Sequence, residues 1–143
     1  MGFYEWDQNR RKKLAKLIRR KVFGCADMQG PFPLLRSVIL PAVANAPCGN
    51  YRLSKSDLGE TFVVDYVGRS DTQLAERIAD HINENEYKTF VFCAKLTPGS
   101  AYRQECSDFH DFGGDIGLLE NDPVLGHPHA PEGESLQCPV CGA

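Results

Sequence analysis

Between residues 66 and 82 a strand pattern passes through one glycine directly into a helix pattern. The letters "YVG" end an apolar run, and Leu74, Ile78 and Ile82 then recur at the spacing of one helix face. A second strand pattern, "GNYRLS" at residues 49–54, comes before it, and a short loop containing Asp and Gly joins the two. Two strands joined in this way predict an antiparallel hairpin, which a helix follows here.

The remaining patterns complete an α+β layout. "YKTFVFCAKL" at residues 87–96 is apolar nearly throughout and predicts a third, central strand. We expect one helix to begin near Pro98 and to end before Gly113, and a shorter one over residues 34–43 that is interrupted near Pro41. The predicted fold is therefore a small, three-stranded, mainly antiparallel sheet flanked by helices, with an irregular C-terminal tail that shows no periodicity.

At 143 residues the chain suits one domain with short attachments. We divide it into a helical extension over residues 1–47, a core over residues 48–121 and the irregular tail over residues 122–143. The net charge is only -3, but eight of the sixteen Lys and Arg residues lie within residues 10–21. Asp7 can cap a helix there, which is either a solvated amphipathic helix docked by its apolar stripe or a nucleic-acid contact.

The sequence predicts a cytoplasmic protein with no membrane partner. No apolar run approaches the roughly 20 residues that a membrane span needs, and no secretory signal follows the N-terminal charges. Without such a signal, the six cysteines are more typical of reduced thiols or metal ligands than of a disulfide framework.

Five short motifs occur in an order that resembles the GIY-YIG endonuclease superfamily. "GNY" at residues 49–51 matches the first family motif and "YVG" at 66–68 the second. "RSDTQLAERIADHI" follows with the family's Ser, Leu, helix Arg and later His. Glu105 in "YRQEC" stands where the family places a metal-binding carboxylate, and Asn121 in "LLENDP" matches its later Asn. The resemblance covers residues 49–121 and places these motifs on two strands and two helices.

The resemblance implies a metal-dependent endonuclease that hydrolyses phosphodiester bonds in DNA. By this analogy Tyr51 is the general base, Tyr66 its hydrogen-bonding partner, and Glu105 the ligand of Mg²⁺ or Mn²⁺. Arg77 would bind phosphate, and His81 is either a half-buried helix histidine or a group that contacts phosphate or assists the base. The further substrate-binding positions are Gly49, Gly68, Arg69, Ser70 and Asn121, and a homodimer would allow both strands to be cut.

Elementary chemistry agrees with these residue types. Phosphodiester hydrolysis requires an activated water, neutralisation of charge on the phosphoryl oxygens and help for the departing oxyanion. One carboxylate with several waters is a typical Mg²⁺ arrangement, and a guanidinium fork suits phosphate oxygens. Arg77 and His81 are four residues apart, so a helix would place them on one face. The alternative function is a non-catalytic module with this fold that binds nucleic acid or a protein.

A second metal site is predicted near the C-terminus. Cys106 and His110 lie at i and i+4, and Cys138 and Cys141 form "CPVC", so each pair can supply half of a tetrahedral zinc site. Such a site would fix the aperiodic tail to the second helix. His127 and His129 in "GHPHAP" are competing ligands. In the alternative interpretation, Cys106 is a buried small hydrophobic residue and "CPVC" is a frayed terminus.

Overall fold

A computed structural model describes residues 28–121 and 126–143 of the chain. The predicted basic helix that follows Asp7 lies outside the described residues. None of the helices in the described ranges has the length and apolar character needed to cross a bilayer.

Four antiparallel strands form one sheet in the order β1-β4-β2-β3. The strands are β1 (Gln29–Pro33), β2 (Gly49–Ser54), β3 (Tyr66–Ser70) and β4 (Thr89–Ala94). The α+β class, the β2–β3 pairing and the central place of β4 are confirmed, but the prediction of three strands was one short. The additional strand is β1, which contains two prolines and was not predicted. Because β1 is an edge strand, it tolerates the loss of the backbone N–H donors that proline lacks.

Within the described ranges, three helices and a short 3-10 turn accompany the sheet. They are α2 (Arg36–Val43), α3 (Leu74–Ala79), α4 (Pro98–Asp111) and η1 (Gly114–Ile116). The helix α4 begins and ends as predicted, with Thr97 accepting a hydrogen bond from the Ser100 N–H at its N-terminus. The helix α3 is shorter than predicted, because the chain turns after Ala79 into a segment with several residues at positive φ.

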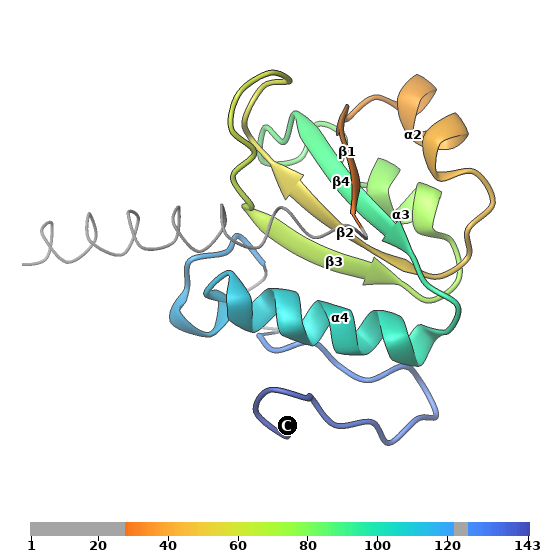
Figure 1. The fold of residues 1–143 in the computed structure, drawn as a ribbon, viewed down its shortest axis with the longest axis vertical. Coiled ribbons are helices and arrows are strands. Elements are labelled where there is room, and N and C mark those ends of the chain that lie inside the picture. The colour runs from red at the N-terminus through yellow and green to blue at the C-terminus, as the bar shows by residue number, and fades with distance from the viewer. Residues whose placement is uncertain (1–27, 122–125) are drawn as a thin grey trace, which may run out of the picture.

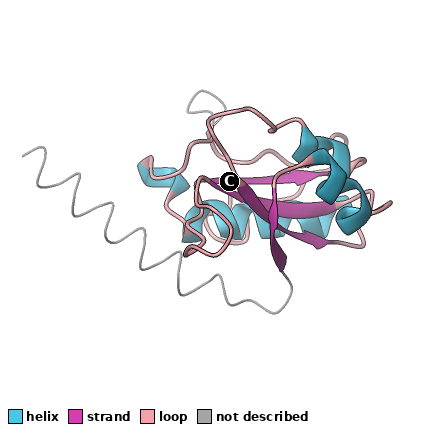
Figure 2. Cartoon of the chain, turned by 90° about the horizontal axis from the view of Figure 1, so that it is seen from above, coloured by secondary structure: helices cyan, strands magenta, loops and turns pink. Residues whose placement is uncertain are grey.

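The helices cover both faces of the sheet (Figures 1 and 2). On one face, α2 and α3 pack against Tyr51 and Leu53 of β2. On the other, α4 packs against β2 and β3, and an apolar cluster there includes Val67 and Phe109. The irregular tail runs along α4, as Figure 1 shows. Since β1 and α2 belong to this core, residues 29–43 are more than an extension of it.

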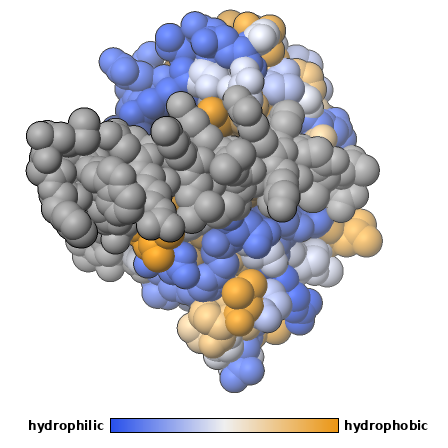
Figure 3. Space-filling view, turned by 60° about the vertical axis from the view of Figure 1, so that its left-hand side comes forward, coloured by the Kyte–Doolittle hydropathy of each residue, from blue (hydrophilic) through white to orange (hydrophobic). Residues whose placement is uncertain are grey.

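The surface view in Figure 3 shows mostly hydrophilic residues around the grey atoms. Hydrophobic residues among the coloured atoms form separate small groups on that face. The part of the surface that Figure 3 shows in colour is therefore predominantly polar.

A buried ion pair attaches α4 to the sheet. Arg52 of β2 is fully buried, and its Nε and Nη2 donate to the two carboxylate oxygens of Asp108 at 3.2 and 2.9 Å. Gln104 donates to the same carboxylate at 2.9 Å, and the Arg52 guanidinium lies 4.9 Å from the ring centroid of Phe112. Because each of these buried charges needs the other as its partner, the pair fixes where α4 lies on the sheet.

Replacing Asp108 by Ala is expected to lower the free energy of unfolding by about 3–5 kcal/mol, because it leaves the Arg52 charge buried without its partner. Urea unfolding followed by circular dichroism measures the change. The control is Asp111→Ala, which removes an exposed carboxylate from the same helix. Equal stability of the two variants would contradict this account of the ion pair.

Candidate active site and metal centre

A cleft of about 270 Å³ opens beside the edge strand β3. Its walls come from β3, from the residue after it, from α3, from α4 and from the tail. The lining residues are Tyr66, Arg69, Asp71, Arg77, Glu105, Asn121, Gly126, His127, Pro128 and His129. Five positions predicted from the sequence as catalytic or substrate-binding therefore meet in one cleft: Tyr66, Arg69, Arg77, Glu105 and Asn121.

Tyr51 lies behind the cleft rather than on its wall. Its side chain is fully buried, its ring stacks on that of Tyr66 with centroids 6.2 Å apart, and its hydroxyl lies 2.8 Å from His81 Nε2. Gly68 makes room for this phenol, because a Cβ at that position would lie 2.4 Å from the Tyr51 hydroxyl oxygen. Gly68 was predicted as a substrate-binding position, and the structure places it inside β3, where it serves the packing of Tyr51.

His81 connects Tyr51 to a carboxylate that the sequence analysis missed. His81 is buried, and its Nδ1 lies 3.0 Å from Glu84 Oε1. An ionised carboxylate only accepts hydrogen bonds, so Nδ1 carries the proton and Nε2 is free to accept from the Tyr51 hydroxyl. Only the i, i+3 spacing of His81 and Glu84 in the sequence signalled this contact.

Burial controls protonation in this part of the site. It lowers the pKa of His81, with Glu84 acting in the opposite direction, so the neutral imidazole is favoured. It also raises the pKa of Tyr51 well above its usual value and raises that of Tyr66, while the positive charge of Arg77 opposes both changes. His81 is therefore neutral in this network, with Nε2 available as an acceptor for the Tyr51 hydroxyl.

The acidic end of the cleft contains two carboxylates around one guanidinium. Arg69 donates to Glu105 at 2.7 Å and to Asp71 at 2.9 Å, and it lies 5.2 Å from the ring centroid of Tyr102. Burial raises the pKa of Glu105 to about 7, although Arg69 acts to lower it. Asp71 was not among the site residues predicted from the sequence, so its place in the cleft was missed.

Three of the predicted substrate-binding residues have structural contacts. The Asn121 side chain accepts from the Val67 N–H at 3.2 Å and donates to the Val67 carbonyl at 2.8 Å, as a neighbouring strand would. Ser70 Oγ accepts from the Gln73 N–H at 2.8 Å and so supports the start of α3. A Cβ at Gly49 would lie 2.5 Å from a carbonyl oxygen of β4. These contacts position β3 and its neighbours.

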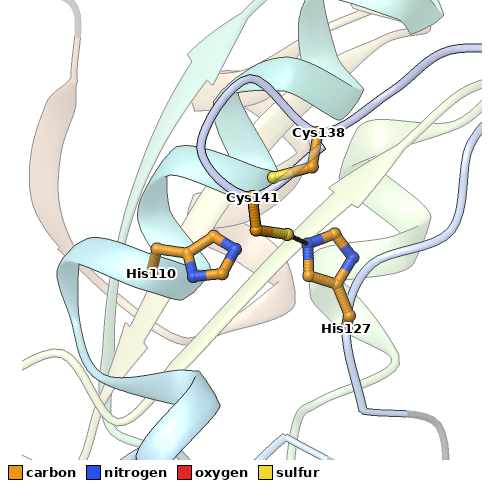
Figure 4. A group of neighbouring side chains, drawn as sticks. All are labelled: His110, His127, Cys138 and Cys141. Carbon is orange, nitrogen blue, oxygen red and sulfur yellow. Dashed lines mark hydrogen bonds between the residues drawn. The ribbon is translucent and has the colours of Figure 1, made fainter. Parts of the chain in front are cut away.

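Four side chains near the C-terminus form a group that can hold a metal ion. The ligand atoms of His110, His127, Cys138 and Cys141 all lie within 4.8 Å of one another. They come from α4, from the tail and from the "CPVC" turn, and the Cys141 sulfur lies between the two imidazoles in Figure 4. Three predicted ligands are in this group, but Cys106 is not, and His127 takes its place.

The two histidine rings are oriented as metal ligands usually are, with the second nitrogen held by an acceptor. His110 Nδ1 lies 3.5 Å from the Asp115 carboxylate, and its Nε2 is buried with no hydrogen-bond partner among the described residues. His127 Nδ1 donates to the Pro128 carbonyl at 2.8 Å, which leaves Nε2 3.4 Å from Cys141 Sγ. That separation is close to the roughly 3.5 Å edge of a tetrahedral zinc site.

The cysteines differ in their suitability as ligands. Burial opposes ionisation of the Cys138 thiol, but hydrogen bonds from the backbone N–H groups of Cys141 and Val140 outweigh it, and its pKa falls to about 6. Cys106 is fully buried against Tyr102 and Cys138, and burial raises its pKa to about 12. The prediction that Cys106 is a ligand was wrong. Although Cys106 lies four residues before His110, its thiol is outside the ligand group and packs in an apolar cluster.

We compared the chain with protein-family models, with curated proteins and with solved structures, and none of the three comparisons found a match.

Proposed function

We propose that this protein is a metal-dependent endonuclease that hydrolyses phosphodiester bonds in DNA. The observation that carries the proposal is the convergence of Tyr66, Arg77 and Glu105 in one cleft, although they lie on β3, α3 and α4. A phenol, a guanidinium and a carboxylate are the groups that the resemblance to the GIY-YIG superfamily assigns to this reaction. Chance packing of unrelated elements does not account readily for this combination.

The cations of the cleft suit a phosphate group. Arg77 lies on the wall with about half of its side chain exposed (49%). Its only ion pair among the described residues is a long one, 3.9 Å to the exposed carboxylate of Asp80, so a phosphate could compete for the guanidinium. Arg69 is less available, since it is 12% exposed and already donates to two carboxylates.

The carboxylate of Glu105 suits Mg²⁺ or Mn²⁺, because these ions accept one protein carboxylate together with several waters. Glu105 lies on the cleft wall, and Asp71 supplies further negative charge beside it. When bound, the ion would neutralise charge on the phosphoryl and leaving oxygens. Arg69 balances the buried charge of Glu105 and so keeps the carboxylate in place for this role.

The proton removed from the attacking water has a path into the protein. Tyr66 lines the cleft, and its ring stacks on that of Tyr51 with the ring centroids 6.2 Å apart. Tyr51 is in turn hydrogen-bonded to the neutral imidazole of His81, which Glu84 orients. We assign Tyr66 to contact the water and Tyr51 with His81 to accept the proton behind it.

We further propose that the group of two histidines and two cysteines holds a structural Zn²⁺. Four protein ligands of these types make a closed tetrahedral site, which leaves no position for a substrate. Such a site fixes the tail to α4, the helix that carries Glu105.

The proposed function is tested by incubating labelled duplex, nicked, branched and single-stranded DNA, and RNA of the same sequence, with the protein and Mg²⁺ or Mn²⁺. We expect cleavage of at least one DNA substrate, with Tyr66→Phe and Tyr51→Phe each slowing it about 100-fold, because each removes one hydroxyl of the proton path. Tyr87→Phe is the matched control, since that ring lies 6.1 Å from the Tyr66 ring but is not part of the cleft wall. Its rate should equal that of the wild type.

One observation favours the second candidate function, a binding module without catalysis. The 2.7 Å contact between Arg69 and Glu105 already neutralises the carboxylate without a metal ion. DNA binding that is unaffected by Mg²⁺, with no cleavage of any substrate, would support this alternative and reject the endonuclease.

The affinity for Mg²⁺ is expected to rise with pH up to about pH 7 and then to level off. The pKa of Glu105 is raised to about 7, and a protonated carboxyl group does not bind the ion, so protons compete below that pH. The apparent affinity should fall about tenfold for each pH unit below it. Calorimetric Mg²⁺ titrations between about pH 5 and pH 9 measure it; a constant affinity over that range would indicate an ordinary carboxylate pKa.

A further inference from the structure

The metal-ligand group and the cleft share one segment of the chain. His127 belongs to the ligand group, and the residues around it, Gly126, Pro128 and His129, line the cleft together with Tyr66 and the two arginines. The His127 Nδ1 bond to the Pro128 carbonyl holds the ring against its own backbone. A ligand bound to His127 Nε2 therefore constrains the cleft wall directly.

A second connection runs through α4. Tyr102, Cys106 and the ligand Cys138 form one buried cluster, with Leu136 of the tail packed against it. The face of the Tyr102 ring lies 5.2 Å from the Arg69 guanidinium, which holds Glu105. The tail is thus connected to the cleft in two ways. His127 lines the cleft directly, and Cys138 packs with Tyr102, whose ring lies beside Arg69.

A few contacts besides the ligand group hold this part of the tail. Residues 126–131 form no helix or strand, Ala130 packs against the cluster of Tyr102, Cys106 and Cys138, and the His127 ring lies 5.6 Å from that of Phe109. Ordering such a segment costs about 1–2 kcal/mol for each residue, so some interaction must offset that cost. The four ligand side chains provide the site for such an interaction. One of their atoms, His110 Nε2, is buried and has no hydrogen-bond partner in the part of the chain that the structure describes.

Of the two histidines in this segment, His127 belongs to the ligand group and His129 does not. His129 is exposed, and it lines the cleft that also contains Arg69 and Arg77. An imidazole presented there can donate a hydrogen bond to a phosphate oxygen. His129 lies two residues after His127 in the chain.

We propose that the metal centre builds the substrate cleft: zinc bound through His127 fixes residues 126–129 as one wall, and His129 on that wall contacts the phosphodiester backbone. The identity of the substrate rests on the proposed function, whereas the dependence of the wall on zinc does not. The two parts therefore have separate measurements.

The first measurement is the backbone order of the wall, by ¹⁵N relaxation without any nucleic acid. In the zinc-loaded protein we expect the amides of Gly126, His127 and His129 to have order parameters near 0.85, falling below about 0.6 after zinc removal. Adding zinc back should restore them. The variant His127→Ala should resemble the zinc-free protein, and Cys106→Ala the loaded one. Unchanged order without zinc would overturn the claim that the centre builds the wall.

The second measurement is the binding of a short labelled duplex DNA with Ca²⁺ in place of Mg²⁺, so that no strand is cut. Zinc-free wild type and His127→Ala should bind about tenfold more weakly, with zinc add-back rescuing only the wild type. His129→Ala should keep one zinc per chain and bind about fivefold more weakly, because one phosphate contact is lost. Full affinity in His129→Ala would overturn its contact with substrate. If loaded wild type binds no nucleic acid, the proposed function and the His129 contact both fail, and the relaxation data still decide the role of zinc.

Discussion

Replacing Glu105 by Gln is expected to reduce the rate of DNA cleavage about 1,000-fold, which corresponds to roughly 4 kcal/mol of transition-state stabilisation. The amide keeps the shape of the side chain but cannot offer a negative charge to Mg²⁺. Initial rates on the best DNA substrate, at saturating Mg²⁺, measure the effect. Binding of the same DNA in Ca²⁺ should change little, because the loss concerns the reaction rather than the fold.

The matched control for Glu105 is Asp71→Asn. Asp71 accepts from the same guanidinium at 2.9 Å but is more exposed, with 31% of its side chain accessible compared with 14% for Glu105. We expect a loss of less than tenfold for this variant, because Arg69 keeps its shorter contact with Glu105. Equal losses in the two variants would contradict the assignment of the catalytic ion to Glu105 alone.

Removing zinc is expected to lower the melting temperature by at least about 5 °C, which corresponds to a loss of about 1–2 kcal/mol for a chain of this size. The purified protein should contain one zinc per chain, and Cys141→Ser should lose both the metal and the added stability. Metal analysis and thermal unfolding, each with and without a chelator, measure these quantities.

Cys106→Ala distinguishes a metal ligand from a neighbouring thiol. It removes a cysteine that is buried beside Cys138 but lies outside the ligand group, so zinc should stay at one per chain. Loss of zinc in this variant would restore Cys106 as a ligand. Purified wild type without zinc, together with an unchanged melting temperature in Cys141→Ser, would reject the zinc site.

The helices and strands that were predicted correctly are those whose sequence pattern is contained within a few neighbouring residues. The alternation in β2, the nearly continuous apolar run of β4 and the Pro98 start of α4 all have such signals. The strand β1 was missed because its prolines are tolerated only at a sheet edge, and edge position is a property of the whole sheet. The end of α3 at Ala79 was missed for a similar reason, since Ile82 continues the helical spacing while the chain already turns.

The residue types that we propose as catalytic followed from the sequence, but their relation to the cleft did not. The order of motifs indicated Tyr51, Tyr66, Arg77 and Glu105 without showing which phenol reaches solvent. Burial decides that Tyr66 faces the cleft and that Tyr51 lies behind it. Glu84, the acceptor for His81, had no distinctive signal, because a Glu three residues after a His is ordinary in a polar segment.

The sequence by itself determined the α+β class, the hairpin followed by a helix, and the kinds of side chain available for phosphate and metal chemistry. Only the tertiary structure decided which of them meet. Cys106 and His110 have the spacing of a ligand pair, yet the fold of the tail brings His127 to the fourth position and leaves Cys106 in an apolar contact. Helical spacing fixes which residues share a face, whereas a ligand group also depends on how an irregular segment packs against that face, and irregular segments carry no periodic signal.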